Sequence, residues 1–419
     1  MSVQSAPRSR DQTFRVAIRR FDPFARAIER QWAAFQAETG CPLTLVHESL
    51  DLHPLVDTLF TREGLKRGEW DIAFVVTDWL ADAVAQEALL DLAPFMAQDP
   101  VPDYPQGWSP TLTSMQRFGE QIVGLPYHDG PECLIYRTDL FADPQEQAAF
   151  TERYGYALEP PRTWEAFTDV AQFFTRPGDG LYGTVFAAYP DGHNTVYDFC
   201  LQLWSRGGDL LDERGVPRLN SAEAVSGLDF YRSLLHDRSR TPPGLEQIDS
   251  VQSGELFASG SVAMMVNWFG FAAVCEQPGC IVKGKTGVTT LPAAPEVAPA
   301  SLVVYWLLGV AAGSPHPETA YAFARHCCTP AMDKLTTLEG GIGCRLSTWA
   351  DPEVNAMIPF YWDLPRLSAS ARTLPRSRSL PALIAIIDES VQAALTTTEP
   401  TVSILGRAQS RAVNLNLID

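Results

Sequence analysis

The first 95 residues alternate between segments that predict strands and segments that predict helices. The strand-like runs are Phe14–Phe21, "PLTLVHES" (42–49) and "WDIAFVV" (70–76), and apolar residues at helical spacing fill 22–39 and 77–95. The third run is almost continuously apolar, as in a strand covered on both faces. A β-α-β-α-β order predicts an α/β fold with a parallel sheet flanked by helices.

Strand-like segments return late in the chain, after a helix-rich middle. "PPRTWEAFTDVAQFFT" (160–175) begins a helix at Thr163, and further helical patterns follow before "VAMMVNW" (262–268) and "TGVTTLP" (286–292). A chain of 419 residues suits two domains. A chain that leaves one lobe and returns to it needs several linkers, and such a hinge commonly encloses a small-molecule site.

The charge balance restricts the class of partner. Lys plus Arg is 32 and Asp plus Glu is 50, so the net charge is −18. This excess of negative charge argues against nucleic acid and anionic membranes as general partners. The most apolar run, Ser301–Ala312, is far shorter than the roughly 20 residues that a membrane span needs.

Cysteine and histidine usage favours neither a metal site nor a disulfide framework. The eight cysteines include no C-x-x-C pair, and most are expected to be buried small apolar residues. Cys275–Cys280 is the one bridge that the spacing suggests. The seven histidines are scattered, so we expect no metal and no cofactor.

Several polar and aromatic residues follow predicted strands, where open α/β sheets bind their ligands. Asp78 and Trp79 come directly after the third strand. They could bind a ligand through a carboxylate and a flat aromatic face, or they could be a helix N-cap and a ring packed in the core. Asn267 and Trp268 end a later strand, and could contact a sugar or pack in the core. Tyr305 and Trp306 are adjacent in a strand-like run, so at most one can face a cleft.

A second set lies near turns and glycines. "GLPYHDGPECLIYRTDLF" (124–141) places His128, Asp129 and Glu132 between a turn and a strand. They could form an acid/base cluster, a metal site, a solvated loop or the polar wall of a cleft, and Asp129 with Glu132 could serve glycoside hydrolysis. Other candidates are Asn194 and Tyr197 near a helix start, and Gly341 and Arg345 in "GGIGCRLS" (340–347), where bare backbone and a forked donor could meet a ligand.

An ordered set of segments resembles the extracellular solute-binding proteins of ABC importers, in the carbohydrate-binding group that includes maltose-binding protein. The segments are "WDIAFVVTDWLADAVAQEALLDLAPF", "GLPYHDGPECLIYRTDLF", "PPRTWEAFTDVAQFFT", "LWSRGGDLLDERGVPRLNSAEAVSGLDFYRSLL", "ELFASGSVAMMVNWFGFAA", "GVTTLP" and Gly340–Gly341. They follow the family's order and cover roughly residues 14 to 400.

The resemblance implies the two-lobed type II periplasmic-binding-protein fold. An N-terminal lobe would comprise 13–124 and 293–328, and a C-terminal lobe 128–286 and 333–415, with crossings near 124–127, 287–292 and 326–333. A monomer would capture a carbohydrate or polyol in the interlobe cleft and deliver it to the permease subunits, with no chemistry. The alternatives are a carbohydrate-active enzyme that uses Asp129 and Glu132, and a cytosolic sugar sensor.

The resemblance also assigns expected roles. Its binding segments map to Asp78, Trp79, His128, Asp129, Asn267, Trp268, Tyr305, Trp306 and Gly341. Asp129 would accept hydroxyl hydrogen bonds, His128 would donate one or respond to pH, and Glu132 would cap or pair with an arginine. From the residues alone, an acidic or sulfated sugar could be met by Arg19, Arg20, Arg345 and Arg376, although we expect surface or structural roles for most of them. Glu48, past the second strand, would instead suit a neutral polyol. The N-terminus has no apolar secretion segment, so the expected periplasmic location assumes that a signal has been removed.

Overall fold

The computed structural model describes residues 12–190, 192–237 and 239–417. The contacts divide the chain into two compact units, which are described separately. Unit 1 contains the described residues up to Asp129 together with Val304–Ala356, and unit 2 contains Gly130–Val303 and the described residues from Met357 onward. The N-terminal segment 1–11, on which the localisation prediction depends, lies outside the described residues.

Unit 1 is built on a five-stranded sheet with the strand order β2-β1-β3-β12-β6. Its strands are β1 (Thr13–Arg19), β2 (Thr44–Leu50), β3 (Ile72–Val76), β6 (Leu125–His128) and β12 (Trp306–Val310). β1 pairs in parallel with β2 and β3, while β12 runs antiparallel to both β3 and β6. The parallel β-α-β-α-β start is therefore confirmed, and every residue of β3 is buried, as its apolar sequence predicts.

The helices of unit 1 pack on this sheet and on one another. They are α1 (Asp22–Thr39), α2 (Leu52–Val56), α3 (Leu80–Ala85), α4 (Ala93–Gln98), α5 (Pro110–Met115), α13 (Pro317–Cys327), α14 (Pro330–Leu338) and α15 (Leu346–Trp349), with α16 (Pro352–Met357) at the boundary with unit 2. α1 has Pro23 in its first turn, where a proline is well tolerated. Gly40 caps its C-terminal end with a φ of 69°, a left-handed conformation that glycine adopts readily. Its apolar face buries Trp32, which stacks on Phe14 of β1.

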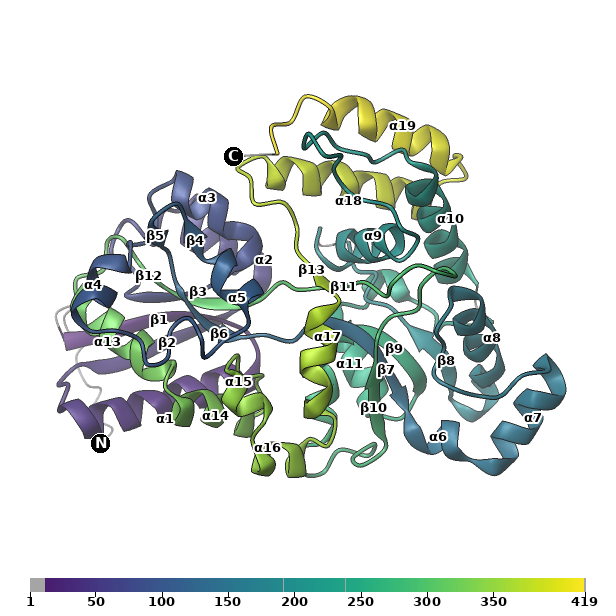
Figure 1. Cartoon of the computed structure of the whole chain (residues 1–419), viewed down its shortest axis with the longest axis horizontal. Coiled ribbons are helices and arrows are strands. Elements are labelled where there is room, and N and C mark those ends of the chain that lie inside the picture. Colours follow the sequence, from purple (N-terminus) through teal and green to yellow (C-terminus); the bar gives the residue numbers. More distant parts are fainter. Residues whose placement is uncertain (1–11, 191, 238, 418–419) are drawn as a thin grey trace, which may run out of the picture. The chain divides into compact units, whose positions relative to one another are not determined.

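Unit 2 contains a four-stranded sheet with the order β10-β7-β9-β8 (Figure 1). Its strands are β7 (Glu132–Arg137), β8 (Tyr182–Val185), β9 (Val262–Trp268) and β10 (Thr286–Thr289). β7 is antiparallel to β9 and β10, and β8 is parallel to β9. A short parallel pair joins β11 (Ser301–Leu302) to β13 (Ala371–Arg372) in the same unit. The predicted strands at 262–268 and 286–292 correspond to β9 and β10.

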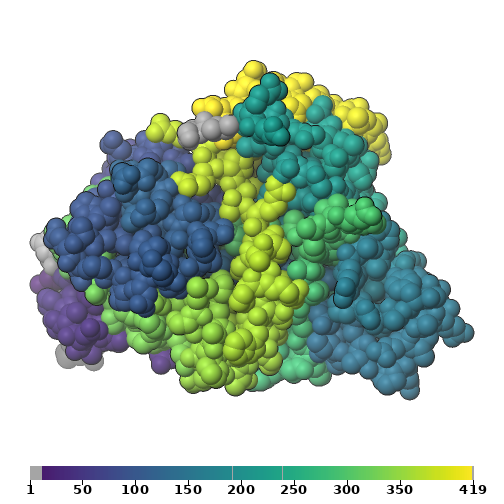
Figure 2. Space-filling model, in the orientation of Figure 1, coloured from purple at the N-terminus to yellow at the C-terminus, as the bar shows by residue number. Residues whose placement is uncertain are grey.

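The helices of unit 2 are α6 (Thr138–Ala142), α7 (Pro144–Tyr154), α8 (Trp164–Phe174), α9 (Asn194–Trp204), α10 (Ala222–His236), α11 (Ser250–Ala258), α12 (Phe269–Cys275), α17 (Leu364–Ala369), α18 (Leu380–Thr396) and α19 (Thr401–Ala412). Thr163 caps α8 as predicted, because its hydroxyl accepts from the N–H of Ala166. Figure 2 shows the last two helices, in yellow, against the teal surface of the middle of the chain, and α18 and α19 both contact α10.

The observed unit boundaries differ from the predicted crossings. The chain changes unit after Asp129, Val303 and Ala356. Residues 333–356, which the sequence assigned to the second lobe, belong to unit 1 because α14 packs on α1. There the amide of Gln31 donates to the carbonyl of Met332 and to the hydroxyl of Thr336.

Candidate functional site

Aromatic rings collect in unit 1 at the carboxyl end of β3. The strand leads directly into a short 3₁₀ turn, Thr77–Trp79, in which Asp78 is buried and Trp79 is partly exposed. The Trp79 ring meets the Trp306 ring edge to face, with centroids 5.7 Å apart. Trp306 reaches the same place because β12 runs antiparallel to β3 and pairs it with Val76. Two predicted segments, far apart in sequence, thus form one aromatic wall.

His128 and Gly341 meet at the end of β6. The Nδ1 atom of His128 accepts a hydrogen bond of 2.8 Å from the N–H of Ile342, and the N–H of Asp129 donates to the carbonyl of Ile342 at 3.1 Å. A Cβ atom on Gly341 would lie 3.7 Å from Nδ1 of His128, an ordinary contact, but 2.8 Å from the side chain of Thr336 and 3.0 Å from its carbonyl oxygen, so a larger residue would clash with α14. β12 places Trp306 opposite His128.

This arrangement fixes the state of the imidazole. Because Nδ1 accepts a hydrogen bond, the neutral ring carries its proton on Nε2. Burial lowers the pKa of His128 from 6.5 to about 3. His128 is therefore a neutral hydrogen-bond donor at physiological pH, and the expectation that it responds to pH does not hold in that range.

A buried aspartate that the sequence analysis missed orders the glycine-rich loop. Asp333 of α14 accepts hydrogen bonds from the N–H groups of Cys344 and Arg345 and from the hydroxyl of Thr348. Burial raises the pKa of Asp333, against these hydrogen bonds. No local motif marks this residue, since its partners lie 11 to 15 residues further along the chain.

Arg345 is committed to the scaffold of unit 1. Its guanidinium donates to the carbonyls of Pro102 and Cys328 and to the carboxylate of Asp103, and it lies 4.4 Å over the ring of Trp108. The side chain is 2% exposed. The predicted forked donor to a ligand is thus used internally instead.

Two further candidates in unit 1 lie apart from this wall. The ring of Tyr305 is fully buried, and its hydroxyl donates to the carbonyl of Leu112, so Trp306 is the partly exposed member of the adjacent pair. Glu48 is exposed on β2, which β1 separates from β3.

The corresponding residues of unit 2 gather at the end of β9. Trp268 is partly exposed there, and Tyr197 of α9 meets it edge to face with centroids 5.8 Å apart. Asn267 is buried, its amide donates to the carbonyl of Ser250 and the hydroxyl of Ser253, and its oxygen accepts from the N–H of Trp268. Asn267 therefore fixes the backbone that carries Trp268. Asn194, the first residue of α9, is buried.

Glu132 lies opposite Trp268 in the β7–β9 register and is buried. It interacts with a carboxylate that the sequence analysis did not select, Asp198 of α9. Burial raises the pKa of Glu132, and the neighbouring charge of Asp198 raises it further. Burial also raises the pKa of Asp198 to about 7, although the Tyr231 hydroxyl, which donates to it over 2.7 Å, acts in the opposite direction.

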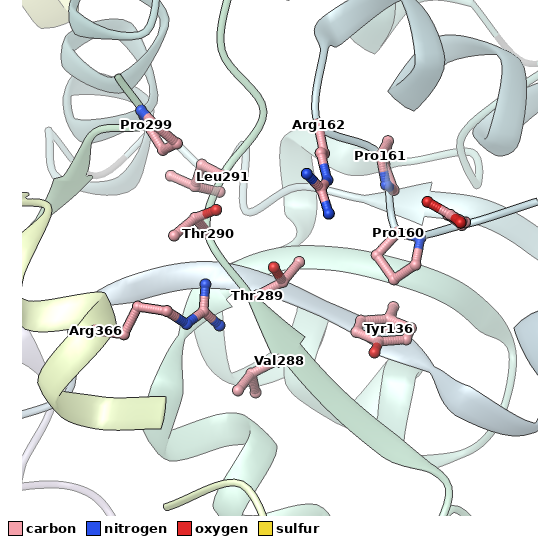
Figure 3. Close-up of a pocket in the computed structure, with 11 residues that line it drawn as sticks. Tyr136, Pro160, Pro161, Arg162, Val288, Thr289, Thr290, Leu291, Pro299 and Arg366 are labelled. Atoms are coloured by element: carbon pink, nitrogen blue, oxygen red, sulfur yellow. The ribbon is translucent and has the colours of Figure 1, made fainter. Parts of the chain in front are cut away.

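A pocket of about 440 Å³ lies elsewhere in unit 2, and none of the predicted ligand-binding residues lines it. Figure 3 shows the guanidinium groups of Arg162 and Arg366 entering it from opposite sides, with Thr289 and Thr290 between them and Tyr136 below. Asp363 already pairs with Arg366 at 2.8 Å. The pocket offers hydrogen-bond donors to an anionic group, at a place distinct from the aromatic residues described above.

Three negative observations apply to the described part of the chain. It contains no cluster of three or more metal-ligating side chains. All of its cysteines are free thiols, including Cys275 and Cys280, so the bridge suggested by their spacing is absent. None of its helices is both long and apolar enough to cross a membrane.

Comparison with known proteins identifies the family. The family model described as bacterial extracellular solute-binding protein matches residues 23–333, about three quarters of the chain. The chain belongs to this family. The predicted family resemblance and the predicted two-lobed α/β fold are thereby confirmed, and the protein is a solute-binding protein.

Two relatives of this solute-binding protein are themselves named as binding proteins. A probable ABC transporter-binding protein of Deinococcus radiodurans is 24% identical over 337 residues, which are 79% of this chain and 76% of that protein. A mannitol-binding protein of Pseudomonas aeruginosa is 26% identical over 245 residues, which are 57% of this chain but only 53% of that protein.

Solved structures match nearly the whole solute-binding protein. The maltose-bound MalE3 of T. maritima superposes with a TM-score of 0.83 at 22% identity, over 96% of this chain and 98% of that one. An ABC transporter solute-binding protein of Agrobacterium radiobacter K84 in complex with ribitol gives a TM-score of 0.82 at 25% identity, with the same coverage.

Proposed function

We propose that this protein captures a neutral sugar or polyol outside the cytoplasmic membrane and delivers it to the permease of an ABC importer. The observation that carries the proposal is the pair of aromatic walls, Trp79–Trp306 in unit 1 and Tyr197–Trp268 in unit 2, each with buried polar side chains beside it. Flat rings suit the C–H faces of sugars, and the polar groups suit hydroxyls. The relatives' ligands, mannitol and ribitol among them, support the same class.

The expectation of a neutral solute follows from the cations near the candidate residues. Arg345 is engaged within unit 1, and Arg19 and Arg20 both pair with Asp51. His128 is neutral for the reason given above. An acidic sugar would need a cation that these residues do not offer, whereas hydroxyl groups need only neutral donors and acceptors.

The proposed ligand-binding residues come from both units. In unit 1 they are Asp78, Trp79, His128, Asp129, Trp306 and Gly341; in unit 2 they are Glu132, Asn194, Tyr197 and Trp268, with Asn267 as the support of Trp268. We propose that the protein acts as a monomer in the periplasm and that it performs no chemistry on the solute.

The test is thermal unfolding and isothermal titration calorimetry with monosaccharides, oligosaccharides, polyols and sugar acids. A solute that binds the native state raises its stability by RT ln(1 + [L]/Kd), about 2.7 kcal/mol at a hundredfold excess over Kd. We expect a shift confined to one class of neutral polyhydroxyl compounds. A shift with sugar acids alone would contradict the neutral-solute proposal, and product formation from a bound glycoside would favour an enzyme instead.

A further inference from the structure

Unit 2 buries two carboxyl groups together beside its aromatic pair. Glu132 of β7 is 3% exposed and Asp198 of α9 is 4% exposed, and the charge of Asp198 acts on Glu132. Asp198 accepts a hydrogen bond of 2.7 Å from Tyr231 of α10. In the described part of the chain, Oε2 of Glu132 is buried without a hydrogen-bond partner. A buried oxygen in this state costs free energy unless some other group satisfies it.

The surroundings supply no compensating positive charge from a basic side chain. Among the described residues, neither an arginine nor a lysine acts on either carboxyl group. Other titratable groups on the neighbouring elements include Cys133 on β7, Tyr197 and Cys200 on α9, Tyr231 on α10 and Asp388 on α18, which accepts from Thr195 of α9. The arginines of β7 and α10 are engaged elsewhere, since Arg137 pairs with Asp139 and Arg232 donates to the carbonyl of Glu399. Two buried carboxylates without a cation repel each other, so the pair retains protons that exposed carboxyl groups would lose.

The pair also lies at the proposed solute-binding surface. Glu132 and Trp268 are directly opposite in the β7–β9 register, so their side chains leave the same face of the sheet. Tyr197, the chain neighbour of Asp198, contacts Trp268 on that face. A change in the charge of the pair therefore occurs directly beside the aromatic wall.

We propose that Glu132 and Asp198 form a proton-holding carboxyl pair that binds a hydroxyl group of the solute, so that the solute is bound together with a proton. This inference rests on the proposed function and adds Asp198 and Tyr231 to the site. The solute supplies the partner that Oε2 of Glu132 lacks within the described residues. When Glu132 is protonated, this oxygen can donate its hydrogen bond to a hydroxyl oxygen of the solute, which an ionised carboxylate cannot do, so solute binding favours proton uptake.

The coupling between solute binding and proton uptake has a defined sign. Since burial raises the pKa of Asp198 to about 7, the empty pair begins to lose a proton near neutral pH. A solute that prefers the protonated pair binds most tightly below that pH. Above it, the Kd rises by up to tenfold per pH unit, and each binding event takes up as much as one proton.

The experiment measures proton uptake by calorimetry in buffers of different ionisation enthalpy between pH 5.5 and 8.5, with ribitol, D-mannitol and maltose as probes. Wild-type protein is expected to take up protons above pH 7. In the double variant Glu132→Gln, Asp198→Asn the pair cannot ionise, so proton uptake is expected to vanish at every pH at which the variant binds a probe, whatever its Kd. Uptake that is absent from wild type, or unchanged in the double variant, would overturn the inference.

The variant Tyr231→Phe gives a second measurement, the pH midpoint of binding, which would not change if Tyr231 had only a structural role. It removes the hydroxyl that favours the charged form of Asp198, so the pH midpoint of binding should rise. Tyr136→Phe, also in unit 2, is the matched control and should leave the midpoint unchanged. A Tyr231→Phe variant that weakens binding equally at every pH would contradict the inference.

Tryptophan fluorescence of the ligand-free protein separates this inference from the proposed function. Wild type should show an inflection near pH 7 that the double variant lacks, and its absence from wild type would overturn the inference even without a known solute. Failure of every probe and every other sugar or polyol to bind at any pH would instead overturn the proposed function.

Discussion

The Nδ1 atom of His128 accepts a hydrogen bond of 2.8 Å from the backbone N–H of Ile342, across 214 positions of the chain. This contact joins the end of β6 to the glycine-rich loop and places the proton of the imidazole on Nε2, while burial keeps the ring neutral. A residue that sequence reasoning considered as a pH sensor is thus a fixed donor within unit 1.

His128 should contribute to acid denaturation. Its pKa is about 3 in the native state and 6.5 in the unfolded chain, so the unfolded chain binds more protons between these values. The stabilisation is fully present above about pH 6.5 and is lost as the pH falls toward 3. Urea unfolding of His128→Gln from pH 4 to 7 should show a weaker pH dependence than wild type. His236→Gln, at an exposed helix end, is the control; an equal change in both variants would contradict the assignment.

Trp268→Ala should weaken solute binding by about 1–3 kcal/mol, or roughly 5- to 150-fold in Kd, because the solute loses its aromatic face. Titration calorimetry measures the change, and circular dichroism checks that the variant is folded. Trp362, which is 59% exposed in the same unit, provides the matched control variant Trp362→Ala. Unchanged affinity in Trp268→Ala would remove this residue from the site.

Asp333→Ala should lower the free energy of unfolding by about 3 kcal/mol, because three donors lose a buried acceptor. Disorder of the loop at 340–345 should also weaken solute binding. Denaturant unfolding and calorimetry report the two effects separately. Asp363→Ala, at a largely accessible pair with Arg366, is the comparison and should cost well under 1 kcal/mol. A stable Asp333→Ala variant would show that the loop is ordered by other contacts.

Arg345→Met should lower the free energy of unfolding by about 1–3 kcal/mol, since it leaves the carbonyls of Pro102 and Cys328 without the donor that the buried guanidinium supplies. Thermal and denaturant unfolding measure this loss, and the folded fraction should still bind neutral solutes. Arg366→Met, an exposed arginine in a local ion pair, is the control. A folded and fully stable Arg345→Met variant with greatly reduced solute affinity would return Arg345 to the ligand-binding set.

Much of the fold could be read from local patterns. The strands and the first helix predicted over residues 14–76 correspond to β1, α1, β2 and β3, because hydrophobic periodicity and caps act over a few residues. The helical segment predicted at 77–95 is interrupted, since α3 ends at Ala85 and α4 begins at Ala93. The division into units was harder to predict. Residues 333–356 join unit 1 through contacts with α1, some 300 positions away, and no local pattern records such packing.

Some candidate site residues could likewise be judged from the local sequence, whereas others could not. Adjacent aromatics on a strand predicted that only one of Tyr305 and Trp306 could be accessible, and the structure shows that Trp306 is the partly exposed one. For Arg345 the sequence could show only a cation beside glycines. Whether it meets a ligand or the carbonyls of Pro102 and Cys328 depends on segments brought together by folding.

The sequence by itself determined the family, the α/β elements and the polar and aromatic residues at the strand ends, because each of these is a matter of residue type and spacing. Only the tertiary structure decided the protonation of these groups. The neutral state of His128 and the raised pKa values of Glu132 and Asp198 come from burial and from partners distant in the chain. Desolvation depends on everything packed around a group, and that enclosure exists only once the chain has folded.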